Sequence, residues 1–160
     1  MTDHITSFSF PVKLAYPQVP RCHVGLSKEC VSVFEELKLG KKIKYIIYKL
    51  GDGAKEIVVE KKSENGDYED FIGDLPEAEC RYAIYDFEFE LAAGEGTRNK
   101  ICFYAWSPDD APVRSKMVYA SSKDALRRSL QGIQAEIQGT DFSEISHETV
   151  LGRFVGKKPV

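Results

Sequence analysis

The sequence has 160 residues, of which 42% are hydrophobic and 29% are charged, as is usual for one soluble globular domain. These fractions exclude a chain that is disordered throughout, and no apolar run approaches the roughly 20 residues that a membrane-spanning helix needs. The net charge of −3 differs from the basic balance of nucleic-acid-binding domains, so we expect no nucleic-acid partner.

The charges are unevenly distributed along the chain. Residues 60–95 contain 12 acidic and 3 basic side chains, whereas residues 112–131 contain 5 basic side chains and 1 acidic one. A basic segment in a mildly acidic protein indicates a local surface for an acidic partner.

Residues 1–23 lack sustained periodicity and contain three prolines within ten positions, Pro11, Pro17 and Pro20. We expect a flexible amino-terminal extension over this segment. Two origins stay open: a true extension that tunes contact with a partner, or a mistaken start in the gene model. The regular domain is expected to cover residues 24–158.

The first half of the domain is predicted to form a helix, a hairpin and a second helix. Ser27 is a suitable helix cap, apolar residues follow it at helical spacing, and Gly40 ends the segment. Residues 43–50 and 55–62 resemble strands and flank a Gly-Asp-Gly turn, which indicates a hairpin. Residues 67–75 again show helical spacing before a proline.

The second half is predicted to form two central strands, a long helix, an edge strand and a final helix. Residues 80–91 and 101–106 are apolar on both faces, as in strands that are covered on two sides. Residues 113–131 have the most regular helical pattern, 133–137 alternate like a short edge strand, and 143–154 indicate a helix. The fold class is therefore α/β in the α+β sense, with a central mixed sheet of five to six strands and helices on both faces.

The predicted long helix has two contrasting faces. One side is basic with apolar residues at its centre, whereas the opposite side is apolar and is expected to face the core. An ordinary solvated face with one exposed methionine would explain the basic side. A docking surface would explain it too, because a methionine among basic residues suits an apolar groove with an acidic rim. The basic side comprises Lys116, Met117, Ala120, Lys123, Asp124, Arg127 and Arg128, and the core side Val118, Tyr119, Ala125, Leu126 and Leu130.

The cysteines and histidines form no recognisable chemical site. Cys30, Cys80 and Cys102 lie in apolar patterns and are expected to be reduced core residues. The histidines are far apart in the sequence, and no clustered set of ligands indicates a metal. We therefore expect no catalytic residues, no metal, no cofactor and no enzyme activity.

One long segment and several short ones carry a family resemblance. The long segment, at 106–130, reads WSPDDAPVRSKMVYASSKDALRRSL. The short segments read LKLGKK at 37–42, YAIYDFEFE at 82–90, EGTRNK at 95–100 and QGTDFSEIS at 138–146. Together they resemble the actin-depolymerising factor/cofilin family, and its fungal members more than relatives such as coactosin or twinfilin. The resemblance covers about residues 24–155.

The resemblance implies a single cofilin-type (ADF-homology) domain that binds actin monomers and filaments, severs filaments and promotes their depolymerisation. It implies binding of phosphatidylinositol bisphosphate in competition with actin, and a monomeric protein. It also implies a cytoplasmic location at the actin cytoskeleton and its cortical patches, with the nuclear matrix as a further location. Two alternatives stay open: a filament-binding relative that does not sever, and a phosphoinositide-binding module whose actin binding is weakened by an altered amino terminus.

The resemblance also implies residue roles, by position. A surface for monomers and filaments would comprise Val24, Arg114, Lys116, Met117, Ala120, Lys123, Asp124, Arg127 and Arg128. A second, filament-binding surface would comprise Arg98, Lys100, Arg153 and Lys157. Phosphoinositides would bind Lys123, Arg127 and Arg128, since clustered cations attract anionic headgroups.

The chain departs from the family pattern in two places. Cys22 and His23 precede Val24 where relatives have Ser-Gly, so the serine that is phosphorylated in many relatives is absent. Gly152 and Gly156 replace an acidic and a basic residue of the fungal pattern in the final helix. Because a glycine inside a helix costs ~1 kcal/mol relative to alanine, we expect a weaker filament-side contact.

Overall fold

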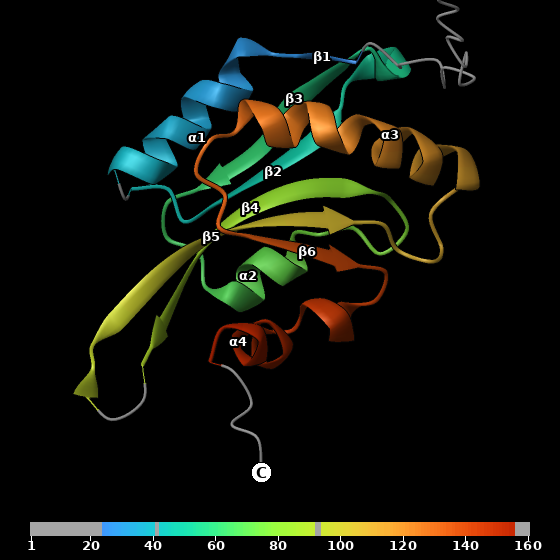
Figure 1. The fold of residues 1–160 in the computed structure, drawn as a ribbon. Helices are drawn as coiled ribbons and strands as arrows, with labels where there is room; N and C mark the ends of the chain where they lie inside the picture. Colours follow the sequence, from blue (N-terminus) through green and yellow to red (C-terminus); the bar gives the residue numbers. More distant parts are fainter. Residues whose placement is uncertain (1–23, 41, 92–93, 156–160) are drawn as a thin grey trace, which may run out of the picture.

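The computed structural model describes residues 24–40, 42–91 and 94–155, which form a six-stranded sheet with helices on both faces (Figure 1). The strand order is β1-β3-β2-β4-β5-β6, so the predicted mixed sheet and fold class are confirmed. The four middle strands pair antiparallel, whereas the two outer strands each pair parallel with a neighbour. The strands are β1 (Gly25–Leu26), β2 (Tyr45–Leu50), β3 (Glu56–Ser63), β4 (Arg81–Glu90), β5 (Thr97–Trp106) and β6 (Ala135–Gly139).

Four α-helices in the described ranges cover the sheet in two layers. Helices α1 and α3 lie over one face, and α2 and α4 lie under the other (Figure 1). None of these helices is both long and apolar enough to cross a membrane. The helices are α1 (Lys28–Gly40), α2 (Tyr68–Gly73), α3 (Val113–Ser129) and α4 (His147–Val155), and short 3-10 turns occupy Asp52–Ala54 (η1) and Phe142–Ile145 (η3).

Two hydrophobic cores lie on opposite faces of this sheet. Successive side chains of a strand point to opposite faces, so each central strand contributes to both cores. In β4, Tyr82 and Ile84 pack with α1 and α3, whereas Ala83 and Tyr85 pack with α2 and α4. This arrangement confirms the prediction that the long apolar strands are covered on two sides.

The three predicted core cysteines are also confirmed. Cys30, Cys80 and Cys102 are fully buried free thiols. Burial raises the pKa of the Cys102 thiol to about 12, which keeps it in the protonated, unreactive form.

The sheet differs from the prediction at its ends. Strand β1 was not predicted; it is only two residues long and pairs Gly25 with Glu56 of β3. Strand β5 begins at Thr97, four residues earlier than expected, and its pairing with β4 runs from Thr97 opposite Glu90 to Trp106 opposite Arg81. Residues 97–99 are exposed, so no apolar alternation marks them, and pairing with β4 alone keeps them extended.

The predicted final helix over residues 143–154 is wrong in its first part. A 3-10 turn (η3) ends at Ile145, Ser146 is extended with φ −59° and ψ 153°, and α4 starts at His147. The Ser146 hydroxyl accepts a hydrogen bond from the Thr149 backbone N–H at 3.3 Å, so Ser146 caps α4. The apolar spacing predicted one continuous helix, but a serine at this position can cap a new helix and so interrupts it.

Gly152 in the middle of α4 provides a stability test. A Cβ placed there would have no heavy atom within 4 Å, and the backbone is helical. We therefore expect Gly152→Ala to raise the free energy of unfolding by about 0.5–1 kcal/mol, because alanine loses less backbone entropy on folding. Urea unfolding monitored by circular dichroism would measure the change, and an unchanged or lower midpoint would contradict it.

Candidate functional site

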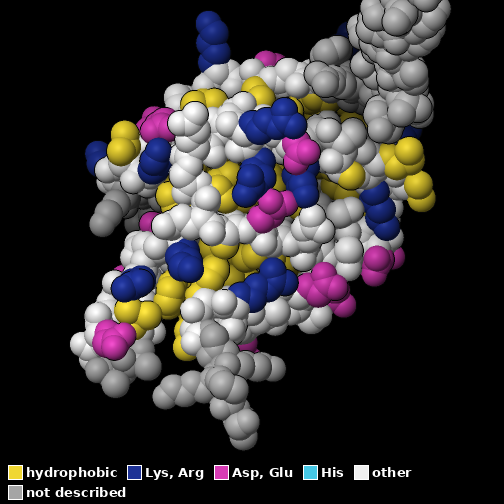
Figure 2. All heavy atoms as spheres, in the orientation of Figure 1, with side chains coloured by type: hydrophobic (Ala, Val, Ile, Leu, Met, Phe, Trp, Pro, Cys, Tyr) yellow, Lys and Arg dark blue, Asp and Glu magenta, His cyan; other side chains and the backbone are white. Residues whose placement is uncertain are grey.

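Helix α3 presents a mixed apolar and basic face to solvent. Met117 is 67% exposed, and Val113, one turn earlier, is 73% exposed. With the exposed Ala120 they form a line that we call the apolar strip: Val113, Met117 and Ala120. Figure 2 shows this side of the molecule, where Lys and Arg side chains gather over α3 with hydrophobic and acidic side chains between and beside them. Val113 was missed in the sequence, although its spacing of four from Met117 indicates the same helix face.

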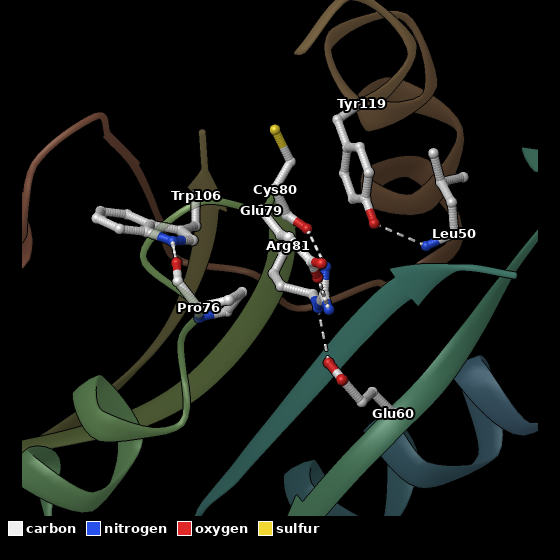
Figure 3. Close-up of polar contacts among 8 residues, drawn as sticks. All are labelled: Leu50, Glu60, Pro76, Glu79, Cys80, Arg81, Trp106 and Tyr119. Atoms are coloured by element: carbon white, nitrogen blue, oxygen red, sulfur yellow. Dashed lines mark hydrogen bonds and ion pairs between the residues drawn. The ribbon is translucent and has the colours of Figure 1, made fainter. Parts of the chain in front are cut away.

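The opposite face of α3 is fixed to the sheet by a tyrosine. Tyr119 is buried, and its hydroxyl accepts a hydrogen bond from the Leu50 backbone N–H at 3.0 Å, at the end of β2 (Figure 3). The Tyr82 hydroxyl of β4 donates to the Tyr119 carbonyl oxygen. Ser122 and Leu126 complete the buried side, so the predicted core face of the helix is confirmed there.

The sheet beneath α3 is held by a partly buried arginine. The Arg81 side chain is 12% exposed and pairs with Glu60 at 2.8 Å and with Glu79 at 2.7 Å (Figure 3). On the next strand, the Trp106 indole N–H donates to the Pro76 carbonyl oxygen at 2.7 Å. These contacts tie β3, β4 and β5 to the α2–β4 connection in the sheet on which α3 packs.

The predicted cations on α3 differ in what they contact. The Lys116 ammonium donates to the Asp109 carbonyl oxygen at 2.8 Å, which ties the helix to the loop before it. Lys123 and Arg127 both pair with Glu136 of β6, each at 2.8 Å. Arg114, Asp124 and Arg128 are exposed and, within the described residues, make no ion pair.

Glu136 was not identified from the sequence. No local pattern indicates it, because its contact with α3 depends on β6 pairing parallel with β5 beside the helix. Hydrogen bonds from Lys123 and the positive charges of Lys123 and Arg127 hold the pKa of Glu136 below its ordinary value of 4.5.

The lowered pKa predicts a pH dependence of stability. A carboxyl whose folded-state pKa is lowered stabilises the fold above its unfolded value, and this contribution is lost as pH falls through the folded-state pKa. We therefore expect Glu136→Gln to remove part of the wild-type loss of stability on acidification below pH 4.5. Urea unfolding at a series of pH values would measure both slopes, and parallel curves would contradict the expectation.

The residues of the predicted filament surface come from two elements that meet. Arg98 and Lys100 lie on β5, and Arg153 lies on α4. The Lys100 ammonium lies 4.9 Å from the centre of the Phe154 ring, a cation–π contact that links the strand to the helix. Beside them a cleft of about 600 Å³ is lined by Glu88, Phe89, Glu90, Thr97, His147, Leu151 and Val155, so acidic side chains border this basic surface.

Two predicted site residues, Val24 and Lys157, are not among those that the structure places on the surfaces above. Val24 is only 9% exposed and packs in the core with α1, and its expected part in binding actin stays a prediction. Lys157 lies outside the described residues, as do Gly156 and the expected extension over residues 1–23.

The domain is a mixed six-stranded sheet between two pairs of helices, and one face of α3 exposes apolar and basic side chains together, a combination typical of surfaces that dock on another macromolecule. The chain belongs to the family described as cofilin/tropomyosin-type actin-binding protein, whose model matches residues 23–154. The family expected from the sequence is therefore confirmed.

Individual relatives agree with this assignment. The cofilin of Schizosaccharomyces pombe is 60% identical over 134 residues, which cover 84% of this chain and 96% of the relative. The cofilin of Saccharomyces cerevisiae is 56% identical over 133 residues, covering 83% and 93%. A solved structure described as Streptomyces griseoflavus cofilin has a TM-score of 0.77 and 55% identity, and the match covers 81% of this chain and 96% of that one.

Proposed function

We propose that this protein binds actin monomers and filaments, severs filaments and promotes their depolymerisation. The observation that carries the proposal is the apolar strip on α3, exposed among cations in a chain of the cofilin/tropomyosin-type actin-binding family. Exposed apolar side chains in a line suit a hydrophobic cleft on the partner, and the surrounding cations orient the approach of an acidic surface. The activity is binding, with no covalent step.

The test is fluorescence imaging of single actin filaments with the full chain. Severing would appear as new filament ends, and depolymerisation as faster shortening than in buffer. Filaments that become decorated while their number and shortening rate stay constant would favour the alternative of a binding protein that does not sever. Filaments that the protein neither decorates nor shortens would contradict the proposal.

The second part of the proposal is regulation by phosphatidylinositol bisphosphate in competition with actin, through Lys123, Arg127 and Arg128. Clustered cations gain about 1 kcal/mol each near an anionic membrane surface. The filament contact through Arg98, Lys100 and Arg153 is supported by the cation–π contact of Lys100 with Phe154, which joins β5 to α4. We infer a monomeric protein located at the actin cytoskeleton, including cortical patches, with the nuclear matrix as a further location.

A further inference from the structure

Glu136, on the edge strand β6, contacts two of the predicted anion-binding cations of α3. Each of its carboxylate oxygens has its own partner: Oε1 lies 2.8 Å from Lys123 Nζ, and Oε2 lies 2.8 Å from Arg127 Nε. The Lys123 side chain is 22% exposed and the Arg127 side chain 45% exposed. The carboxylate therefore draws both cations towards the edge strand β6 and away from free solution.

This contact reduces the charge that the surface offers to an anion. Of the three cations expected to bind phosphoinositides, only Arg128 makes no ion pair within the part of the chain that the structure describes. A phosphate that approaches Lys123 or Arg127 must displace Glu136 or bind beside its negative charge. Both cases weaken binding, because exchanging one anion for another gains little and like charges repel.

The two large side chains of the apolar strip come earlier in α3 than this contact. Val113 and Met117 are both exposed, whereas the ion pairs of Glu136 involve Lys123 and Arg127, nearer the end of the helix. A partner that binds mainly through the strip is therefore less sensitive to Glu136 than a partner that binds through charge.

We propose that Glu136 sets the partner preference of this surface: by pairing with Lys123 and Arg127 it disfavours polyanionic membranes relative to a protein with an apolar cleft. This inference rests on the proposed function. It makes Glu136 a residue that determines specificity through its ion pairs with Lys123 and Arg127. It predicts that removal of the carboxylate shifts the balance from actin towards membranes.

The test compares Glu136→Gln with Glu64→Gln. Glu64 is exposed, makes no ion pair in the described ranges and lies outside the proposed surfaces, so this control removes the same charge elsewhere. The contact itself is read by NMR: the Arg127 Nε–H signal should be protected from solvent exchange in the wild type and in Glu64→Gln, and should lose protection in Glu136→Gln.

The consequence is measured by co-sedimentation with phosphatidylcholine vesicles that contain phosphatidylinositol bisphosphate, and by binding to fluorescent actin monomers. Glu136→Gln should bind these vesicles about fivefold more tightly than the wild type, as one added net positive charge near the membrane would predict. Its actin affinity should change less, and Glu64→Gln should match the wild type in both assays. A vesicle affinity for Glu136→Gln no higher than that of the control would overturn the inference. A wild type that does not bind actin would instead contradict the proposed function, and the vesicle comparison would still decide the role of Glu136.

Discussion

Replacing Met117 with alanine should weaken binding to actin monomers by about 30-fold. Truncation of a central apolar anchor in a protein interface typically costs about 2 kcal/mol or more, which corresponds to this factor in the dissociation constant. The folded protein should lose little stability, because the side chain is 67% exposed. Titration of fluorescent actin monomers gives the affinity, and urea unfolding of the same variant gives the stability.

Leu39→Ala is the matched control for Met117→Ala. Leu39 is the most exposed large hydrophobic side chain in the described residues, at 77%, and it lies at the end of α1 rather than on α3. Both substitutions remove a large exposed apolar side chain from a helix, so they differ mainly in position. Equal actin affinities for the two variants would show that the strip does not dock.

The second large effect is expected at Gly66, which precedes α2. A Cβ at this position would lie 2.1 Å from Cε1 of Tyr45. The Tyr45 ring cannot move aside easily, because its hydroxyl donates to Asp74 and its ring packs 5.4 Å from that of Phe71. We expect Gly66→Ala to lower the free energy of unfolding by about 2–3 kcal/mol, as overpacking a filled core does.

Gly73→Ala is the control for this substitution. Gly73 ends α2, and a Cβ there would meet no heavy atom within 4 Å, so its effect should stay within about 0.5 kcal/mol. Urea unfolding of both variants, followed by tryptophan fluorescence of Trp106, measures the difference. If Gly66→Ala were as stable as Gly73→Ala, the close approach of the loop to Tyr45 would be wrong.

The sequence predicts most of this fold because hydrophobic spacing determines which side chains can be buried. The helix of α1, the hairpin of β2 and β3, and the core face of α3 all have a clear period. The ends of elements are different, since they depend on pairing. Thr97 is extended only because β4 lies beside it, and the two residues of β1 are too few to show any period.

The candidate site also contains some features that the sequence predicts and others that depend on the tertiary structure. The exposure of Met117 and the basic residues around it follow from helical geometry, which the sequence contains. The pairing of Glu136 with Lys123 and Arg127 does not, because it joins residues on two elements whose relative placement is set by the whole sheet. The burial of Val24 likewise follows from tertiary packing against α1 and not from any local pattern.

Because neighbouring residues of β4 belong to opposite cores, neither helical layer is an independent folding unit. Loosening α2 and α4 would strip Ala83 and Tyr85 of their contacts and leave Tyr82 and Ile84 on an unsupported strand. The two layers must therefore melt together, as one cooperative transition. A macromolecule that binds α3 therefore also restrains the opposite layer of the molecule, including α4, through the sheet that both layers share.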